Sequence, residues 1–364
     1  MKAASYHEYG IDALRILTSF MVVVLHLLHY GGIQTHVQPF SFSYYSCFTL
    51  GFFFVCAVNC FGLISGYIGY SSKYKISNII SHHFTVLFYT LSITLVFRFV
   101  VPHQFRFSSF FTALSPVTSS TYWYYTSYFV LFMLMPAINA AVATLKKRQL
   151  DFLLLVLLIL LSVIPCILGQ DVFHTKYGYS AFWLSVLYFL GAYLKKYHTQ
   201  YKKNTARHFA VYVFSILSAC IVKFILEYLS YMHSSSTNDY SQIIEYTSPF
   251  ILLSSISLLL MFSTFHFPHS ANHTIRFFSR SSFSTYLLHE HPFIRDLFIR
   301  EQFRYILQFP GLLHIPMLLI SGMAIWLVCI AIDQLRIIIQ KLFRTEKLLD
   351  YLESVFTSLR LYGQ

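Results

Sequence analysis

Charged residues are scarce in this chain. Asp, Glu, Lys and Arg together make up 11% of its 364 residues, and only 14 side chains are acidic. Soluble domains carry about 25% charged residues, so this shortage excludes an ordinary soluble protein and indicates a membrane protein. The N-terminal stretch MKAASYHEYG also has no small-residue cleavage site after it. We therefore expect no removed signal peptide.

Several catalytic and metal-binding motifs are missing as well. The sequence contains no G-x-x-x-x-G-K-[ST] phosphate loop, no G-x-S-x-G nucleophile elbow and no H-E-x-x-H zinc motif, which argues against the enzymes built on them. The six cysteines form no C-x-x-C pair, so buried free thiols are a better interpretation than a redox site. His82 and His83 lack nearby carboxylates, and we expect no bound metal.

Long apolar runs take the place of charge. Hydrophobic residues make up 56% of the chain, and the mean hydropathy is +0.59. A helix that crosses the hydrocarbon core of a bilayer needs about 20 mostly apolar residues. This predicts an all-α fold, a polytopic membrane bundle of about ten transmembrane helices. The predicted spans are 12–31, 47–70, 84–101, 121–143, 150–168, 179–195, 208–231, 244–265, 276–292 and 310–335.

The distribution of Lys and Arg predicts the orientation of the bundle. The formal charge is +12, but the basic residues lie in short loops between spans, where they determine topology. We therefore expect no nucleic-acid partner. The basic loops fall on one side if both termini are cytoplasmic. The last outward loop is an exception, because it carries Arg295, Arg300 and Arg304.

The chain divides into a membrane domain, residues 1–340, and a C-terminal tail, residues 341–364. The tail has apolar residues at helical spacing between charged ones, which is typical of an amphipathic helix. Such a helix can lie on the cytoplasmic membrane surface or pack on the bundle, and the sequence leaves both open.

The first span contains ionisable residues within an apolar run. Such groups are costly at membrane depth and usually face protein or a wet cavity. Arg15 and His26 are eleven residues apart, so at about 100° and 1.5 Å per residue they share a helix face, roughly 16 Å apart along the axis. Asp12, one turn before Arg15, is its expected ion-pair partner, and His29 lies one turn beyond His26. The arginine alone could be a snorkelling anchor, but His26 needs a polar partner and is the best candidate for a general base.

A second polar face lies in the ninth predicted span. Ser279, Ser282, Tyr286 and His289 are spaced by three, four and three residues, so they share one side of a helix. Serines can simply bridge helices in a membrane. His289 followed by Glu290 near the outer end favours a functional site instead.

Four segments, taken together, resemble the acyltransferase 3 family of integral membrane acyltransferases. In chain order they are IDALRILTSFMVVVLH, VNCFGLISGYI, YWYYTSYFVLFMLMPAIN and SSFSTYLLHEHPFI. The resemblance covers nearly the whole chain. It implies an enzyme that takes an acyl group, usually acetyl from acetyl-CoA on the cytoplasmic side, and passes it to a hydroxyl of a cell-surface polysaccharide or its lipid-linked precursor.

The resemblance also assigns residues to roles. Arg15 matches the family's essential arginine, and His26 its catalytic histidine. Ser65 lies in the S-G-[FY] turn, while Tyr286 and His289 match the late Y-L-x-H motif. On this basis residues 1–340 are a membrane acyltransferase domain. The residues expected in catalysis are Asp12, Arg15, His26 and His289; those expected to contact the acceptor are His29, Trp123, Tyr286 and Glu290.

The donor site departs from the family pattern. Many members carry an arginine-rich stretch after the S-G-[FY] turn, where this chain has SSKYKISNIISHHF. We expect Lys73 and Lys75 to replace those charges at the CoA phosphates, together with Arg15 and Ser65.

A transporter or flippase for a lipid-linked sugar is the alternative from another functional class. The buried polar face could then line its path, although the sequence shows no internal repeat. The resemblance favours a multi-pass protein of a bacterial cell membrane. Its expected partners are acetyl-CoA, a polysaccharide or lipid-linked glycan, and membrane lipids, and a homo-oligomer is left open.

Overall fold

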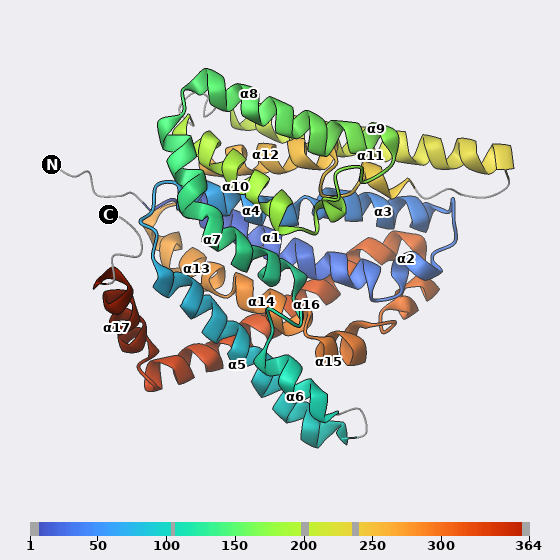
Figure 1. The fold of residues 1–364 in the computed structure, drawn as a ribbon. Helices are drawn as coiled ribbons and strands as arrows, with labels where there is room; N and C mark the ends of the chain where they lie inside the picture. Colours follow the sequence, from blue (N-terminus) through green and yellow to red (C-terminus); the bar gives the residue numbers. More distant parts are fainter. Residues whose placement is uncertain (1–6, 103–105, 198–203, 235–239, 359–364) are drawn as a thin grey trace.

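The structure, a computed structural model, describes residues 7–102, 106–197, 204–234 and 240–358 (Figure 1). All regular secondary structure in these ranges is helical, as the composition predicts. Seven stretches of helix are long and apolar enough to cross a membrane, so the protein is a multi-pass membrane protein. They are formed by α1 (Tyr9–His29) with α2 (Ile33–His36), α3 (Phe42–Val55) with α4 (Ala57–Gly69), α5 (Ile76–Val100), α7 (Trp123–Thr144), α8 (Lys147–Leu158) with α9 (Ile164–Leu168), α11 (Thr205–Ser234) and α16 (Gly311–Leu342).

The other three predicted spans correspond to shorter helices. α10 (Ala181–Lys196) has 16 residues and α12 (Pro249–Ser263) has 15. The ninth predicted span is not one helix, because α13 (His269–Arg280) ends before Ser281 and α14 (Ser282–His289) begins after it. A single helix needs about 20 residues to cross the membrane. By this length criterion, the described helices account for seven of the ten predicted spans.

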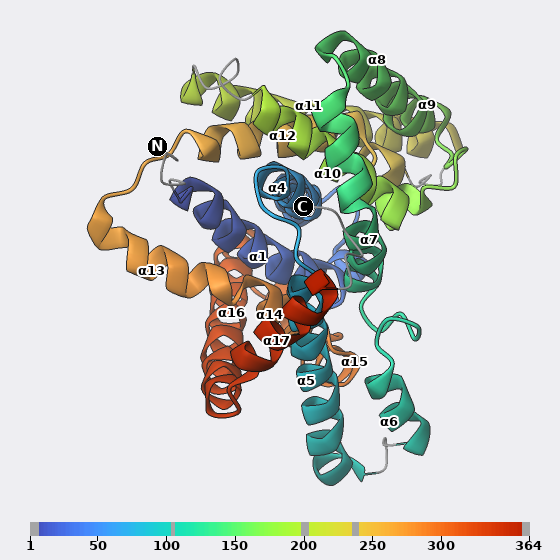
Figure 2. The same cartoon turned by 60° about the vertical axis from the view of Figure 1, so that its left-hand side comes forward.

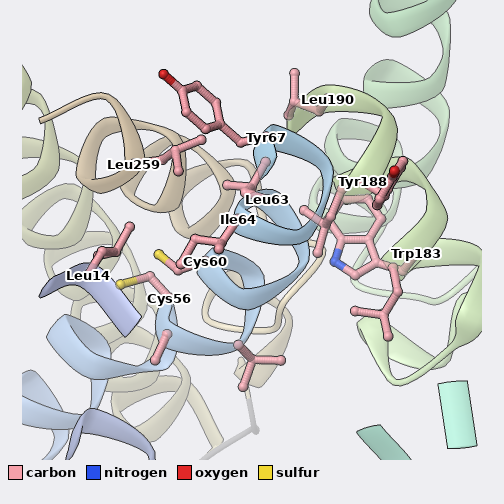
Figure 3. Close-up of a cluster of buried hydrophobic side chains, with 14 of the residues drawn as sticks. Leu14, Cys56, Cys60, Leu63, Ile64, Tyr67, Trp183, Tyr188, Leu190 and Leu259 are labelled. Carbon is pink, nitrogen blue, oxygen red and sulfur yellow. The ribbon is translucent and has the colours of Figure 1, made fainter. Parts of the chain in front are cut away.

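The centre of the bundle lies where α4 packs between α1, α10 and α12. Figure 3 shows Cys60 of α4, and Cys56 just before this helix, in a buried cluster that includes Leu14 of α1 and Leu259 of α12. Both thiols are buried and free, as the sequence predicts. Tight van der Waals packing of this kind holds membrane helices together, because lipid tails are as apolar as the side chains themselves.

The helices α4 and α10 approach each other closely. A Cβ atom on Gly66 would lie 1.9 Å from the carbonyl oxygen of Tyr188, and one on Gly191 would lie 2.1 Å from the carbonyl oxygen of Leu63. Small residues at such a crossing let two backbones touch. The two glycines therefore fix the spacing between α4 and α10.

A buried ionic network secures the junction between α13 and α14. Asp333 of α16 is fully buried. Its carboxylate accepts from Arg336 Nε at 2.6 Å, from Tyr89 Oη at 2.5 Å and from Ser281 Oγ at 2.7 Å. A buried carboxylate needs such partners, and here they tie α5, α16 and the residue between α13 and α14 into one unit.

The tail forms a helix that packs on the bundle. α17 (Thr345–Ser358) contacts α5 and the end of α16, and Figure 2 shows it lying across them. The backbone N–H of Ser77 donates to Glu353 Oε2 at 2.8 Å. The start of α1 lies at the same end of the bundle as α17 (Figure 1). Residues 359–364 of the predicted tail lie outside the described residues.

At the opposite end, two of the three arginines that break the charge pattern are paired locally. Arg295 and Arg300 both donate to Asp296, at 3.2 and 2.8 Å, and Arg295 also donates to Glu290 at 2.8 Å. Burial raises the pKa of Asp296, but hydrogen bonds and positive charge from Arg300 and Arg295 outweigh it, so this pKa lies below its ordinary value. The loop around α15 (Pro292–Ile294) and residues 295–300 thus balances much of its own charge.

Candidate active site

Two histidines from distant parts of the chain meet inside the bundle. His26 lies in the last turn of α1 and His289 ends α14. His26 Nδ1 is 2.9 Å from His289 Nε2, and His289 Nδ1 is 2.5 Å from the carbonyl oxygen of Thr285. His26 Nδ1 is also 3.1 Å from Glu290 Oε2. His26, which is partly buried, therefore has the polar partners that an imidazole within an apolar helix requires.

These contacts determine the protonation pattern of the pair. A carbonyl oxygen only accepts hydrogen bonds, so the Nδ1 of His289 carries a hydrogen toward Thr285. In the neutral ring its Nε2 is then an acceptor, and His26 Nδ1–H is the donor in the 2.9 Å contact. Neutral His26 consequently keeps its lone pair on Nε2. That nitrogen is the one able to take a proton from a substrate hydroxyl.

Glu290 completes the cluster from the other side. Its carboxylate is buried, with Oε1 accepting from Arg295 Nη1 at 2.8 Å. The Arg295 guanidinium also lies 5.0 Å above the Tyr30 ring. Oε2 makes no hydrogen bond with the described residues, although it lies close to His26 Nδ1. Arg295 holds the Glu290 carboxylate close to His26 Nδ1, where its negative charge favours a hydrogen on that nitrogen. The contact with His289 favours a hydrogen on the same nitrogen.

An outer cavity of about 250 Å³ opens beside His26. Trp123, Tyr179 and Tyr246 form one wall, with the ring centroids of Trp123 and Tyr246 6.0 Å apart and their planes 18° apart. Glu290 and His29, two of the residues expected to contact the acceptor, also line it. Flat aromatic faces beside polar groups suit a ring-shaped ligand with an apolar face and hydroxyls on its edge.

A narrower cavity of about 90 Å³ runs from His26 toward the other end of the bundle. It shares His26 and Trp123 with the outer cavity, and Ser282 and Tyr286 lie in its wall. The Ser282 and Tyr286 hydroxyls are buried and make no hydrogen bond with the described residues. Unpaired buried hydroxyls are costly, so these two are available to a ligand that occupies the cavity.

The next cavity, of about 330 Å³, contains Arg15 and Ser65. Arg15 Nη1 lies 2.8 Å from Asp12 Oδ1, which confirms the predicted ion pair. Asp12 Oδ1 also accepts from Ser279 Oγ at 3.1 Å. Ser282 occurs in the walls of both this cavity and the narrow one. Arg15 and His26 therefore face one row of adjoining cavities, as their spacing on α1 predicts.

The structure separates Lys73 and Lys75 from the other predicted site residues and adds two tyrosines that were not predicted. Lys73 and Lys75 are exposed in the turn after α4 and do not line these cavities. Tyr179 and Tyr246, which the sequence did not single out, lie in the outer cavity. They come from irregular segments between helices, where no hydrophobic period marks a residue as inward-facing.

The sequence matches one known family over nearly its whole length. The family model described as an acyltransferase domain, acyltransferase 3, matches residues 8–331. No curated protein matches the chain, and no solved structure does.

Proposed function

The chain belongs to the acyltransferase 3 family, and we propose that it transfers an acetyl group from cytoplasmic acetyl-CoA to a hydroxyl of a surface polysaccharide or of its lipid-linked precursor. The observation that carries this proposal is the row of adjoining cavities from Arg15 to His26. A donor held at one end can reach a base at the other. The family supports acyltransferase activity in general, and the donor and acceptor are our inference.

The proposed orientation of the protein in the membrane follows from the same row of cavities. The cavity with Arg15 faces the end where α17 and the start of α1 lie, and we assign this end to the cytoplasm. In support, Arg15 can pair with an anionic donor, and basic residues are enriched in cytoplasmic loops. The shorter α10, α12 and α13 with α14 would then complete ten crossings. Both termini would be cytoplasmic, in a bacterial cell membrane.

The thioester arm would occupy the narrow cavity. Its amide and carbonyl groups could accept hydrogen bonds from the Ser282 and Tyr286 hydroxyls, which have no described partner. The arm would bring the thioester carbon to His26, which lines both this cavity and the outer one. A sugar in the outer cavity would present its hydroxyl from the opposite side, against Trp123 and Tyr246.

In the proposed reaction, His26 first accepts a proton from the sugar hydroxyl and later donates it to the CoA sulfur. His26 Nε2 takes the proton of the sugar hydroxyl while the sugar oxygen attacks the thioester carbonyl carbon. The carbon–sulfur bond then breaks, and the CoA thiolate leaves with the proton returned from His26. The products are an O-acetyl ester and free CoA thiol. Transient acetylation of His26 itself is a second route to the same products.

The experiment that tests this function is acetyl-CoA-dependent thiol release by the purified protein. His26→Ala should reduce the rate about 10²- to 10⁴-fold, the usual contribution of a general base. His36→Ala is the matched control, because His36 is half exposed and pairs with Glu301 instead. Normal thiol release by His26→Ala at equal folded amount would rule out the assignment. Glycan movement without thiol release would favour the transporter.

A further inference from the structure

A fourth cavity, of about 550 Å³, lies where the end of α16 meets α17. It shares His82, Arg280 and Phe283 with the cavity that contains Arg15, so the two adjoin. Its wall therefore continues the row of cavities to the end of the bundle that we assign to the cytoplasm. Basic side chains dominate this wall: Arg280 of α13, Arg336 and Lys341 of α16, Arg344, and Lys347 of α17.

The positive charge of this cavity is only partly balanced. Arg336 is paired with Asp333 through Nε and Nη2, at 2.6 and 3.2 Å. Among the side chains whose placement the structure describes, those that line the cavity include no Asp or Glu. Arg280, Lys341, Arg344 and Lys347 are exposed, so their charges face a wet space. Several cations around one cavity favour a ligand that carries several negative charges.

Most of these cations lie outside the family domain. The match ends at residue 331, whereas Lys341, Arg344 and Lys347 follow it. Lys341 lies in the last turns of α16, Arg344 in the turn after it and Lys347 in α17. α17 packs on α5 and is tethered by the contact between Ser77 and Glu353. Figure 2 shows α17 lying over the ends of α5 and α16. The C-terminal extension thus brings its own basic residues to the mouth of the row of cavities.

We propose that this basic cavity binds the phosphate groups of the donor nucleotide, with Lys341, Arg344 and Lys347 as the principal contacts. The proposal rests on the function proposed above and assigns the donor's phosphates to the C-terminal extension. It replaces the expectation that Lys73 and Lys75 hold them. Guanidinium and ammonium groups both bind phosphate, the former through two parallel hydrogen bonds. The thioester arm would extend from here past Arg15 into the narrow cavity.

The test compares two donors with the same reactive end. Acetyl-CoA carries the nucleotide phosphates, whereas acetyl-pantetheine lacks them. In the full-length protein, the triple variant K341Q/R344Q/K347Q should raise the KM for acetyl-CoA about tenfold, since exposed charge pairs are individually weak and three are removed. The KM for acetyl-pantetheine should not change. The KM for acetyl-CoA of the parent should also rise with salt more steeply than that of the variant.

Two further variants make the result specific. K146Q/R148Q removes exposed charges at the start of α8, away from the cavity, and should leave both KM values unchanged. K73Q/K75Q tests the competing assignment. The proposal is overturned if the triple variant keeps the parental KM for acetyl-CoA, if both donors are affected equally, or if K73Q/K75Q alone raises that KM.

Direct binding of CoA, measured by calorimetry, separates this proposal from the function proposed above. If the parent binds CoA and the triple variant binds it about tenfold more weakly, the phosphate site stands even if no acetyl transfer is detected. If the parent and the triple variant bind CoA equally, the phosphate site is wrong even if transfer is detected.

Discussion

The sharpest prediction concerns His289, which we expect to position His26 rather than to react itself. His289→Leu removes the acceptor that lies 2.9 Å from His26 Nδ1. Leaving a buried donor without its partner costs about 1–3 kcal/mol. Glu290 Oε2 remains 3.1 Å from the same nitrogen and can replace the lost acceptor, so we expect the low end. A loss of about 1 kcal/mol corresponds to roughly a fivefold decrease in kcat.

The double variant H289L/E290L should lose much more than the product of the two single losses, because each acceptor can substitute for the other. We expect at least about a hundredfold decrease in kcat, within the roughly 10²- to 10⁴-fold limit set by removing the base itself. His289→Gln should recover most of the parental rate. Its amide oxygen can occupy the place of Nε2 and accept from His26.

The assay is thiol release from acetyl-CoA by purified protein, at matched folded amounts judged by size-exclusion chromatography. A decrease in His289→Leu as large as in His26→Ala would show that His289 takes part in the chemistry directly. A parental rate in H289L/E290L would show that neither group positions His26. Failure of His289→Gln to recover the rate would contradict the proposed direction of the hydrogen bond.

Three other predictions test the packing, the ionic network and the acceptor cavity. Gly66→Ala should lower the melting temperature in detergent, because its Cβ would clash with the Tyr188 carbonyl oxygen and overpacking costs about 1–3 kcal/mol. Gly51→Ala is the control, since its nearest neighbour would be at an ordinary 3.5 Å, and an equal effect would contradict the argument. Asp333→Ala should destabilise the protein by about 3–5 kcal/mol, because it leaves the arginine of a buried pair uncompensated; an unchanged melting temperature would refute it. Tyr179→Leu should raise the KM for the glycan acceptor without changing CoA binding, because Tyr179 lines the outer cavity and not the narrow one; equal losses of both would place it outside the acceptor site.

The membrane character and the helical fold could be predicted from local patterns. Low charge and runs of about 20 apolar residues require helices, because only internally hydrogen-bonded segments are stable in lipid. The same local reasoning placed Arg15 and His26 on one face of α1, and both face the row of cavities. It was less successful where helices are short or broken. The junction at Ser281 depends on Asp333, which lies 52 residues further along the chain, and no local pattern reveals such a contact.

The site itself was decided by tertiary structure. His26 and His289 are 263 residues apart, and helical period gives the face of a residue but not its partner. Family resemblance identified both histidines, whereas only their packing determined which nitrogen donates and which remains free. The cations around the basic cavity show the same division. Lys73 and Lys75 are the expected phosphate contacts by sequence position, whereas the packing of the end of α16 and of α17 places Lys341, Arg344 and Lys347 around one cavity. A sequence by itself determines what can be buried and on which side of a helix, because those depend on near neighbours. Which groups meet depends on how the helices pack.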